Sequence, residues 1–230
     1  MDNSPSALQL IATGDPALLA IVKLSLLVST SATLFATLIG APFGALLALV
    51  RFPGREVIVV ILNALMGLPP VVVGLTAYLL LSRSGPLGAL GILFTPAAMI
   101  AAQTILIAPI IAALTRQIVQ DAWVEYRDEF EAMDAGMARR VVTLLWDTRF
   151  SLMTALLAGF GRAAAEVGSI IIVGGNIEGF TRTMTTAIAL ETSKGNLPLA
   201  MGLGMVLMAI VIGVNALAWT VRRIGQRQAG

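Results

Sequence analysis

Long apolar runs that carry almost no charge constrain the fold of this chain more than any other feature of its sequence. A helix needs roughly 20 residues to cross a hydrocarbon core of about 30 Å, and in lipid its backbone groups must be satisfied internally. Several runs are long enough, so we expect an all-α integral membrane protein with five transmembrane helices. The expected helices are Leu24–Val50, Val57–Ser82, a third that starts near Leu90, Phe150–Val173 and Leu197–Val221.

The overall composition narrows the class of protein further. Only 12% of the 230 residues are charged, against about 25% in a typical soluble domain, so we expect a single transmembrane domain over residues 1–230. Cysteine and histidine are absent, which argues against a zinc, haem or thiol enzyme. We therefore expect no catalytic residue, metal or cofactor in this chain, and the small net charge of +2 gives no reason to expect a nucleic-acid partner.

The basic residues predict how the chain is oriented. The first one is Lys23, so the basic start of a cleavable signal peptide is missing and we expect the first apolar segment to be retained. Leu8–Ile21 is too short to span and is broken at Gly14-Asp15-Pro16, which favours an external lead-in or amphipathic helix. Basic residues in short loops stay on the cytoplasmic side. Ten of the 15 fall on one face, which predicts an external N-terminus and a cytoplasmic C-terminus.

Prolines and glycines mark the expected irregularities. The segment Gly67-Leu-Pro-Pro-Val-Val-Val-Gly74 should interrupt the second helix, either as a tolerated kink or as a break that lines a path. Gly85-Pro86-Leu87-Gly88 predicts a turn before the third helix. Gly40 and Gly44, four residues apart, would let another helix backbone approach closely.

The loop from Arg116 to Arg149 holds 12 of the 28 charged residues, and we expect it on the cytoplasmic side. Within it, acidic residues precede Arg139 and Arg140, which suits a helix dipole. Gly136 predicts a turn between two short helices. Four apolar side chains recur at helical spacing and predict one stripe: Tyr126, Phe130, Met133 and Met137. This stripe suits either a partner's groove or the protein's own helix ends, and the pattern alone does not decide between them.

Arg162 and Glu166 interrupt an otherwise apolar span. Each charge near the middle of a bilayer costs roughly 2.5–3.5 kcal/mol, so neither should face lipid. Their four-residue separation places them on one helix face, where they can pair. We expect them to line the translocation pathway, its gate or a subunit interface; the alternative is a structural pin between helices.

The polar segment Thr181–Ser193 has Arg182 and Lys194 at its edges. It is either an interfacial helix near the external mouth, whose basic residues attract an anion, or a solvated connecting loop. The preceding Gly174-Gly175-Asn176 is a weak signal for an anion-binding backbone nest. Asn176 is accordingly included among the candidate pathway or gate residues.

Three stretches resemble a known family. Glu131-Ala-Met-Asp-Ala-Gly136 resembles a degenerate form of the Glu-Ala-Ala coupling motif of ABC importer permeases, although Met133 interrupts the double alanine, the glycine comes one residue early and the usual final proline is missing. Ala158-Gly-Phe-Gly-Arg-Ala-Ala-Ala-Glu-Val-Gly168 resembles the Gly-Arg-x-x-x-Glu segment of the oxyanion permeases. The stretch from Val173 to Gly195 resembles their tungstate branch, and the resemblance extends from about Ser25 to Val221.

This resemblance implies a five-helix bundle of the type I, molybdate-permease-like kind, in a bacterial or archaeal cytoplasmic membrane. Its partners would be membrane lipid, a second copy of the chain, a pair of cytoplasmic ATPases that bind ATP and Mg, and an extracytoplasmic substrate-binding protein. The transported ion would be tungstate, with molybdate or another oxyanion such as sulfate as the alternative. Contact with the ATPase is expected at Glu125, Tyr126, Phe130, Glu131, Ala132, Met133, Gly136 and Met137.

Two rival functions are much less favoured by the sequence. A membrane-embedded enzyme would need Glu166 to act with Asp128, Glu129 or Asp134, but these acids belong to different layers of the expected structure. A self-contained secondary transporter usually has similar halves, and none are evident here. The phosphate-binding Gly-x-x-x-x-Gly-Lys-Ser/Thr motif is also missing, so ATP hydrolysis would require another chain.

Overall fold

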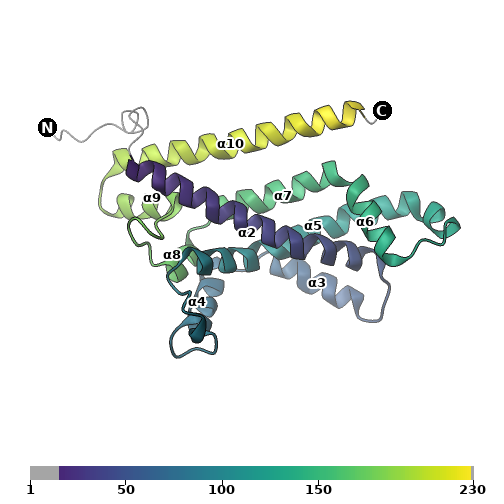
Figure 1. The fold of residues 1–230 in the computed structure, drawn as a ribbon, viewed down its shortest axis with the longest axis horizontal. Helices are drawn as coiled ribbons and strands as arrows, with labels where there is room; N and C mark the ends of the chain where they lie inside the picture. The colour runs from purple at the N-terminus through teal and green to yellow at the C-terminus, as the bar shows by residue number, and fades with distance from the viewer. Residues whose placement is uncertain (1–15, 229–230) are drawn as a thin grey trace. The chain divides into compact units, whose positions relative to one another are not determined.

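The computed structural model describes residues 16–228, and all regular elements in that range are helical (Figure 1). A short 3-10 helix, η1, covers Gly88–Leu90. The α-helices are α2 (Pro16–Leu49), α3 (Arg55–Leu65), α4 (Pro70–Leu81), α5 (Pro96–Ala132), α6 (Met137–Asp147), α7 (Arg149–Ala164), α8 (Gly168–Gly174), α9 (Met184–Ser193) and α10 (Leu197–Gln228).

Three described helices are long and apolar enough to cross a membrane by themselves: α2, α5 and α10. Two bent pairs, α3 with α4 and α6 with α7, raise the number to five if each pair is one span. The chain is therefore an all-helical, multi-pass membrane protein. Contacts divide it into two compact units, which share α2, α5, α7 and α10 as continuous helices.

The first unit comprises the described part of Met1–Ala32, together with Pro69–Gln103 and Gly161–Val214. One core in this unit joins α4, the start of α5 and α8 through Ala77, Met99 and Val173. A second core joins the start of α2 to α9 and α10 through Leu18, Met184 and Leu203. In Figure 1, α9 accordingly lies beside the purple start of α2.

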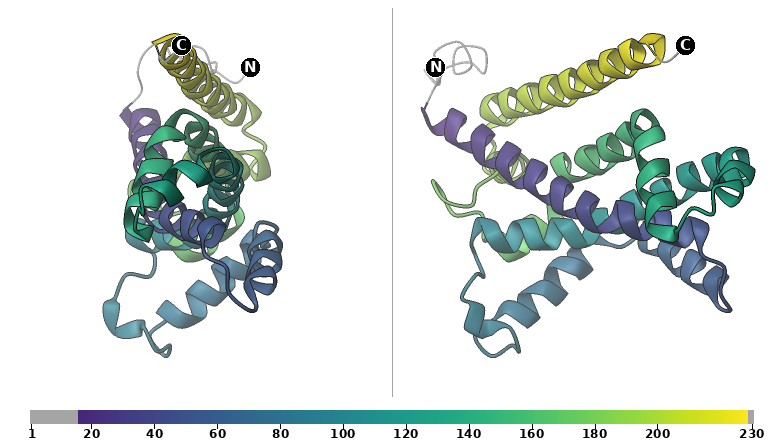
Figure 2. Two further views of the ribbon diagram at one scale, coloured as in Figure 1. Left: turned by 90° about the vertical axis from the view of Figure 1, so that its right-hand side faces the viewer. Right: turned by 45° about the vertical axis from the view of Figure 1, so that its right-hand side comes forward.

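The second unit comprises Thr33–Leu68, Thr104–Phe160 and the described part of Asn215–Gly230. Its α2 and α5 segments cross so closely that a methyl group added at Gly44 would lie 2.3 Å from the carbonyl oxygen of Ala112. Gly40 similarly faces the carbonyl oxygen of Ala108 at 2.8 Å. The close approach expected at Gly40 and Gly44 is therefore present. The end of α5 and α6 form a teal hairpin in the right-hand view of Figure 2.

Several expected boundaries are confirmed. The second span is interrupted between Leu65 and Pro70, because Pro69 and Pro70 cannot donate the backbone hydrogen bonds that would continue α3. Gly136 lies between α5 and α6, and the 82–88 segment forms hydrogen-bonded turns. The last helix covers the expected Leu197–Val221 and continues to Gln228.

Other boundaries are wrong. The first helix begins at Pro16, because the missing N–H of proline is not needed in the first turn of a helix. Pro16–Ile21 is therefore part of the first helix and not a separate lead-in. Residues 8–15 of the expected lead-in lie outside the described range. The third helix begins at Pro96, six residues later than expected, and continues to Ala132 through much of the expected loop. The fourth span ends at Ala164, and a break separates it from α8.

Candidate translocation and coupling sites

The Arg162–Glu166 pair lies at the break between α7 and α8. Arg162 lies in the last turn of α7, where its charge suits the helix dipole, and its Nη1 donates to Glu166 Oε2 at 2.7 Å. Glu166 is 3% exposed, whereas the Arg162 side chain is 33% exposed. The other carboxylate oxygen, Oε1, accepts the backbone N–H of Ser169 at 3.0 Å. One buried carboxylate thus ties the end of α7 to the start of α8.

Uncharged polar side chains satisfy the backbone carbonyls that this break releases. Gln103 on α5 donates its Nε2 to the carbonyl of Ala163 at 2.9 Å. The Thr185 hydroxyl on α9 donates to the carbonyl of Glu166 at 2.7 Å. The expected four-residue pairing is therefore present, but on a broken helix that elements far apart in sequence hold in place.

The start of α8 also packs unusually close to α4. A methyl group added at Gly74 would lie 2.8 Å from Ser169 Cα, and one added at Gly168 would lie 3.0 Å from Val71 Cγ2. Backbone can approach backbone here only because Gly74 has no side chain. The proline break before α4 and the acidic break before α8 therefore meet in one region.

Asn176 does not join the Arg162–Glu166 pair, because it follows the opposite end of α8. It has a left-handed φ of 49°, and its Nδ2 donates to the carbonyl of Thr186 at 3.5 Å. Its Oδ1 is buried without a hydrogen-bond partner in the described part of the chain. The structure therefore places the three candidate pathway residues in two separate groups.

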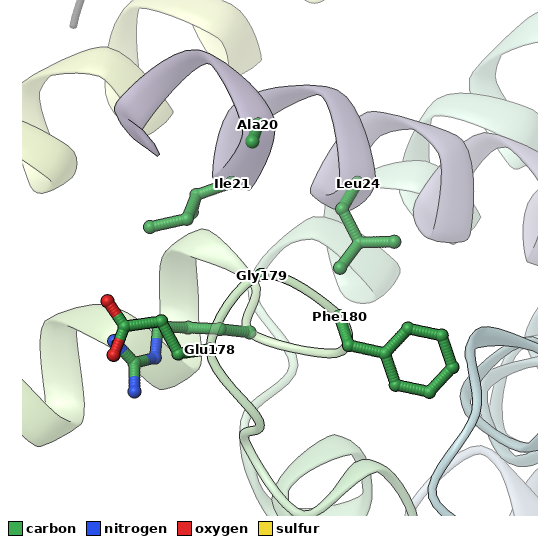
Figure 3. A pocket seen from close by; sticks show the side chains of 7 residues that line it. Ala20, Ile21, Leu24, Glu178, Gly179 and Phe180 are labelled. Atoms are coloured by element: carbon green, nitrogen blue, oxygen red, sulfur yellow. The ribbon is translucent and has the colours of Figure 1, made fainter. Parts of the chain in front are cut away.

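The threonine-rich segment after α8 is mostly buried, so it is not a solvated loop. Thr181, Thr183 and Thr186 each bury their hydroxyls in hydrogen bonds, and Thr183 caps α9 together with Thr186. Next to this segment lies a recess of about 190 Å³ that Ile21, Leu24 and the 178–182 loop line, as Figure 3 shows.

The two basic residues at the edges of this segment are both paired with acids. Arg182 lies 3.4 Å from Glu178, and Lys194 donates to Glu191 at 2.9 Å. The hydrogen bond from Lys194 holds the pKa of Glu191 below its ordinary value, and a second from Asn196 acts in the same direction against the effect of burial. Paired bases attract a passing anion less strongly than free ones, so the expected attraction at this segment is weakened.

The expected coupling stripe is divided in two. Phe130 is buried and stacks on Trp123 with ring centroids 5.9 Å apart, and Tyr126 packs against the same core. Met133 and Met137 are instead 56% and 38% exposed. Part of the stripe therefore packs within the protein, as the alternative interpretation had it, and part is open to a partner.

The remaining candidate coupling residues lie around these two methionines. Glu125 is exposed on α5, and Glu131 pairs with Arg127 at 2.7 Å while half of its side chain stays exposed. Ala132 ends α5, and Gly136 directly precedes α6. The hairpin thus presents methionine and acidic side chains around one turn.

The sequence reading missed Gln103, Ser169, Thr185 and Gly74. The available signal was weak: an uncharged polar residue within an apolar helix is costly unless it is hydrogen-bonded. Gln103 is fully buried, with one of its two amide atoms bonded and the other without a partner in the described residues. Its position within an apolar run could have placed it among the candidates.

Together, the fold and the site define a multi-pass helical membrane protein with a buried ion pair at a broken helix and an exposed hairpin turn. No protein-family model matches the sequence. A probable anion ABC transporter permease of Haloferax volcanii is 43% identical over 205 residues, which cover 87% of this chain and 88% of that protein. This chain therefore belongs to the family of permease subunits of ABC transporters.

Two further relatives have more specific names. The tungstate uptake system permease protein of Peptoclostridium acidaminophilum is 35% identical over 94% of this chain and 95% of that protein. The molybdenum transport system permease protein of Escherichia coli is 28% identical over 91% of this chain and 95% of that protein. The resemblance to the oxyanion permeases is confirmed by these names.

Proposed function

We propose that this chain is the permease subunit of an ATP-driven importer of tungstate. The observation that carries the proposal is the order of similarity: the tungstate permease is 35% identical to this chain, and the molybdenum permease 28%. Molybdate is the second candidate, because it has the same charge and tetrahedral geometry as tungstate and its permease is also a relative.

The pathway would pass the breaks between α3 and α4 and between α7 and α8. Irregular backbone at membrane depth is tolerated where it is buried in protein or lines a cavity. Because Arg162 and Glu166 neutralise each other, they would not hold a dianion tightly, and the ion could be released. We infer that this pair, with Asn176 at the far end of α8, controls the opening of the path, whereas selection of the ion belongs to the substrate-binding protein.

Coupling would take place at the turn between α5 and α6. The exposed Met133 and Met137 offer adaptable apolar contacts, and the acidic residues around them supply charge for an ATPase groove. ATP and Mg would be bound by that ATPase, and closure of two ATPases would draw two copies of the hairpin together. The buried Phe130 and the partly buried Tyr126 would transmit this movement to α2, because they pack in the same core as Ala45 and Leu49.

The rest of the assembly follows from this arrangement. Two copies of the chain would form one path, and an extracytoplasmic binding protein would deliver the ion. The location would be the cytoplasmic membrane, with the N-terminus outside and the C-terminus inside. The ten basic residues on one face support this orientation.

Co-purification with the ATPase tests the coupling part of the proposal. Met133→Asp should lower the amount of ATPase recovered, while Met133→Leu, the matched control, should leave it unchanged. Equal recovery with both variants would show that the ATPase docks elsewhere.

Calorimetry on the partner binding protein tests the substrate. We expect tungstate to bind more tightly than molybdate or sulfate. A tighter complex with molybdate would establish the second candidate instead.

A further inference from the structure

The outward face of α6 and the start of α7 carry exposed apolar and basic side chains. Val141 and Leu144 are buried against the core of the hairpin, whereas Val142 and Trp146 are each 67% exposed. Arg149 follows one turn after Trp146 and is also exposed. This face therefore combines a β-branched side chain, an indole and a guanidinium.

Arg149 is held in place by aromatic rings. Its guanidinium carbon lies 4.8 Å from the Trp146 ring centroid and 4.6 Å from that of Phe150. One of its N–H groups donates to the carbonyl of Trp146 at 2.8 Å. A guanidinium has five N–H donors, and its planar fork matches the geometry of a phosphate. The remaining donors of Arg149 are thus oriented before any ligand arrives.

The position of α6 indicates where such a phosphate would come from. The helix joins α7 at a bend of 78°, and Trp146 and Arg149 lie at this bend, where α7 begins. Tryptophan and arginine at the end of a span are typical of the headgroup layer of a bilayer. The face is therefore next to lipid headgroups if α7 crosses the membrane.

Charge separates this face from the neighbouring helix. The end of α5 exposes Asp121, Glu125 and Asp128, whereas α6 exposes Arg139 and Asp147 and is followed by the exposed Arg149. An anionic surface would therefore repel the end of α5 more strongly than it repels α6, and it would attract Arg139 and Arg149. A negatively charged lipid therefore fits α6 better than it fits any other part of the hairpin.

A second exposed pair in the same unit has the same composition. Trp219 on α10 is 60% exposed, and the guanidinium carbon of Arg223 lies 5.1 Å from its ring. The same arrangement of an exposed tryptophan beside an arginine thus occurs twice, which supports a position of both pairs at the headgroup layer. The α6 pair differs in its second ring, Phe150, which fixes Arg149 from another direction.

We propose that Val142, Trp146 and Arg149 bind the headgroup of an anionic phospholipid, with the phosphate on the guanidinium and the acyl chains along the apolar side chains. In the proposed orientation this lipid belongs to the cytoplasmic leaflet. The site would tie the coupling hairpin to the membrane, so that α6 moves along the surface while the turn before it follows the ATPase.

Fluorescence quenching by brominated lipids tests this site directly. The full chain, with Trp123→Phe and Trp219→Phe so that Trp146 is the only tryptophan, is placed in nanodiscs with bromine in both leaflets. The bromine is carried either by phosphatidylglycerol or by phosphatidylcholine at the same mole fraction. One basic residue near an anionic surface contributes about 1 kcal/mol, or roughly a fivefold enrichment, so phosphatidylglycerol should quench Trp146 more strongly.

Two variants and the ATPase complete the experiment. Arg149→Gln should remove the preference for phosphatidylglycerol, while a change at Arg139, an exposed arginine on α6, should keep it in the variant Arg139→Gln. Equal quenching by both lipids, or equal loss in both variants, would overturn the site. Loss of quenching when the ATPase is added would show that the face is a protein interface instead.

Discussion

Removal of one partner at a time from the Arg162–Glu166 pair should have unequal effects. Arg162→Met leaves a carboxylate that is 3% exposed, with only the Ser169 N–H as a hydrogen-bond partner among the contacts described. Glu166→Gln keeps an oxygen for that N–H and leaves an arginine that is 33% exposed and can reach water. The first change strands a buried charge, whereas the second does not.

The magnitudes follow from burial. Breaking a fully buried ion pair costs about 3–5 kcal/mol, and the partial exposure of Arg162 places Arg162→Met at the lower end, near 3 kcal/mol. Glu166→Gln weakens one charge-assisted hydrogen bond and should cost about 1 kcal/mol. The double variant removes the stranded charge, so it should cost less than the sum of about 4 kcal/mol.

Unfolding in mixed micelles with increasing denaturing detergent measures these free energies. Arg127→Met is the matched control, because Arg127 and Glu131 have the same spacing and the same 2.7 Å distance but are about half exposed. That control should cost much less than Arg162→Met, because exposed ion pairs contribute little to stability. Equal costs for Arg162→Met and Glu166→Gln, or strict additivity in the double variant, would refute the stranded-charge reasoning.

Three further predictions concern other parts of the chain. Gly74→Ala should destabilise the protein by about 1–3 kcal/mol, because the new methyl group meets the backbone at Ser169. Gly161→Ala within α7, where the space is open, should leave stability unchanged or raise it slightly, and thermal unfolding measures both variants. Phe130→Asp should lower stability itself, since Phe130 is buried, and unchanged thermal unfolding would contradict its place in the core. Because the pKa of Glu191 is lowered from its ordinary value of 4.5, its ion pair stabilises the fold above that pH, and the contribution disappears as pH falls through the folded-state pKa. The stability advantage of the wild type over Glu191→Gln should therefore be constant down to a pH of 4.5 and shrink as the pH falls further; an advantage that stays constant in acid would argue against the ion pair as its cause.

The number of spans and the interruption at Pro69 and Pro70 could be predicted because they depend on local chemistry. Apolar length and the missing proline N–H act within one segment. The break after Ala164 could not be predicted in this way. No proline marks it, and it depends on Gln103 and Thr185, which are remote in sequence and supply hydrogen bonds to the released carbonyls.

The outcome for the coupling stripe could also be predicted only in part from the sequence. Helical spacing correctly identified four apolar residues, but it contains no information on which of them find partners. Phe130 stacks on Trp123, and Tyr126 packs in the same core. Met133 lies beyond the end of α5 and stays exposed. A periodic pattern can therefore predict a face, whereas the division of that face between core and surface depends on the tertiary fold.

Transport by the reconstituted system tests the central proposal most directly. Proteoliposomes that contain the chain and its ATPase would receive the loaded binding protein on one side and ATP on the other. The proposal predicts uptake of tungstate that requires ATP and exceeds the uptake of molybdate and of sulfate. ATP-independent uptake by the chain alone, or faster uptake of sulfate than of tungstate, would contradict it.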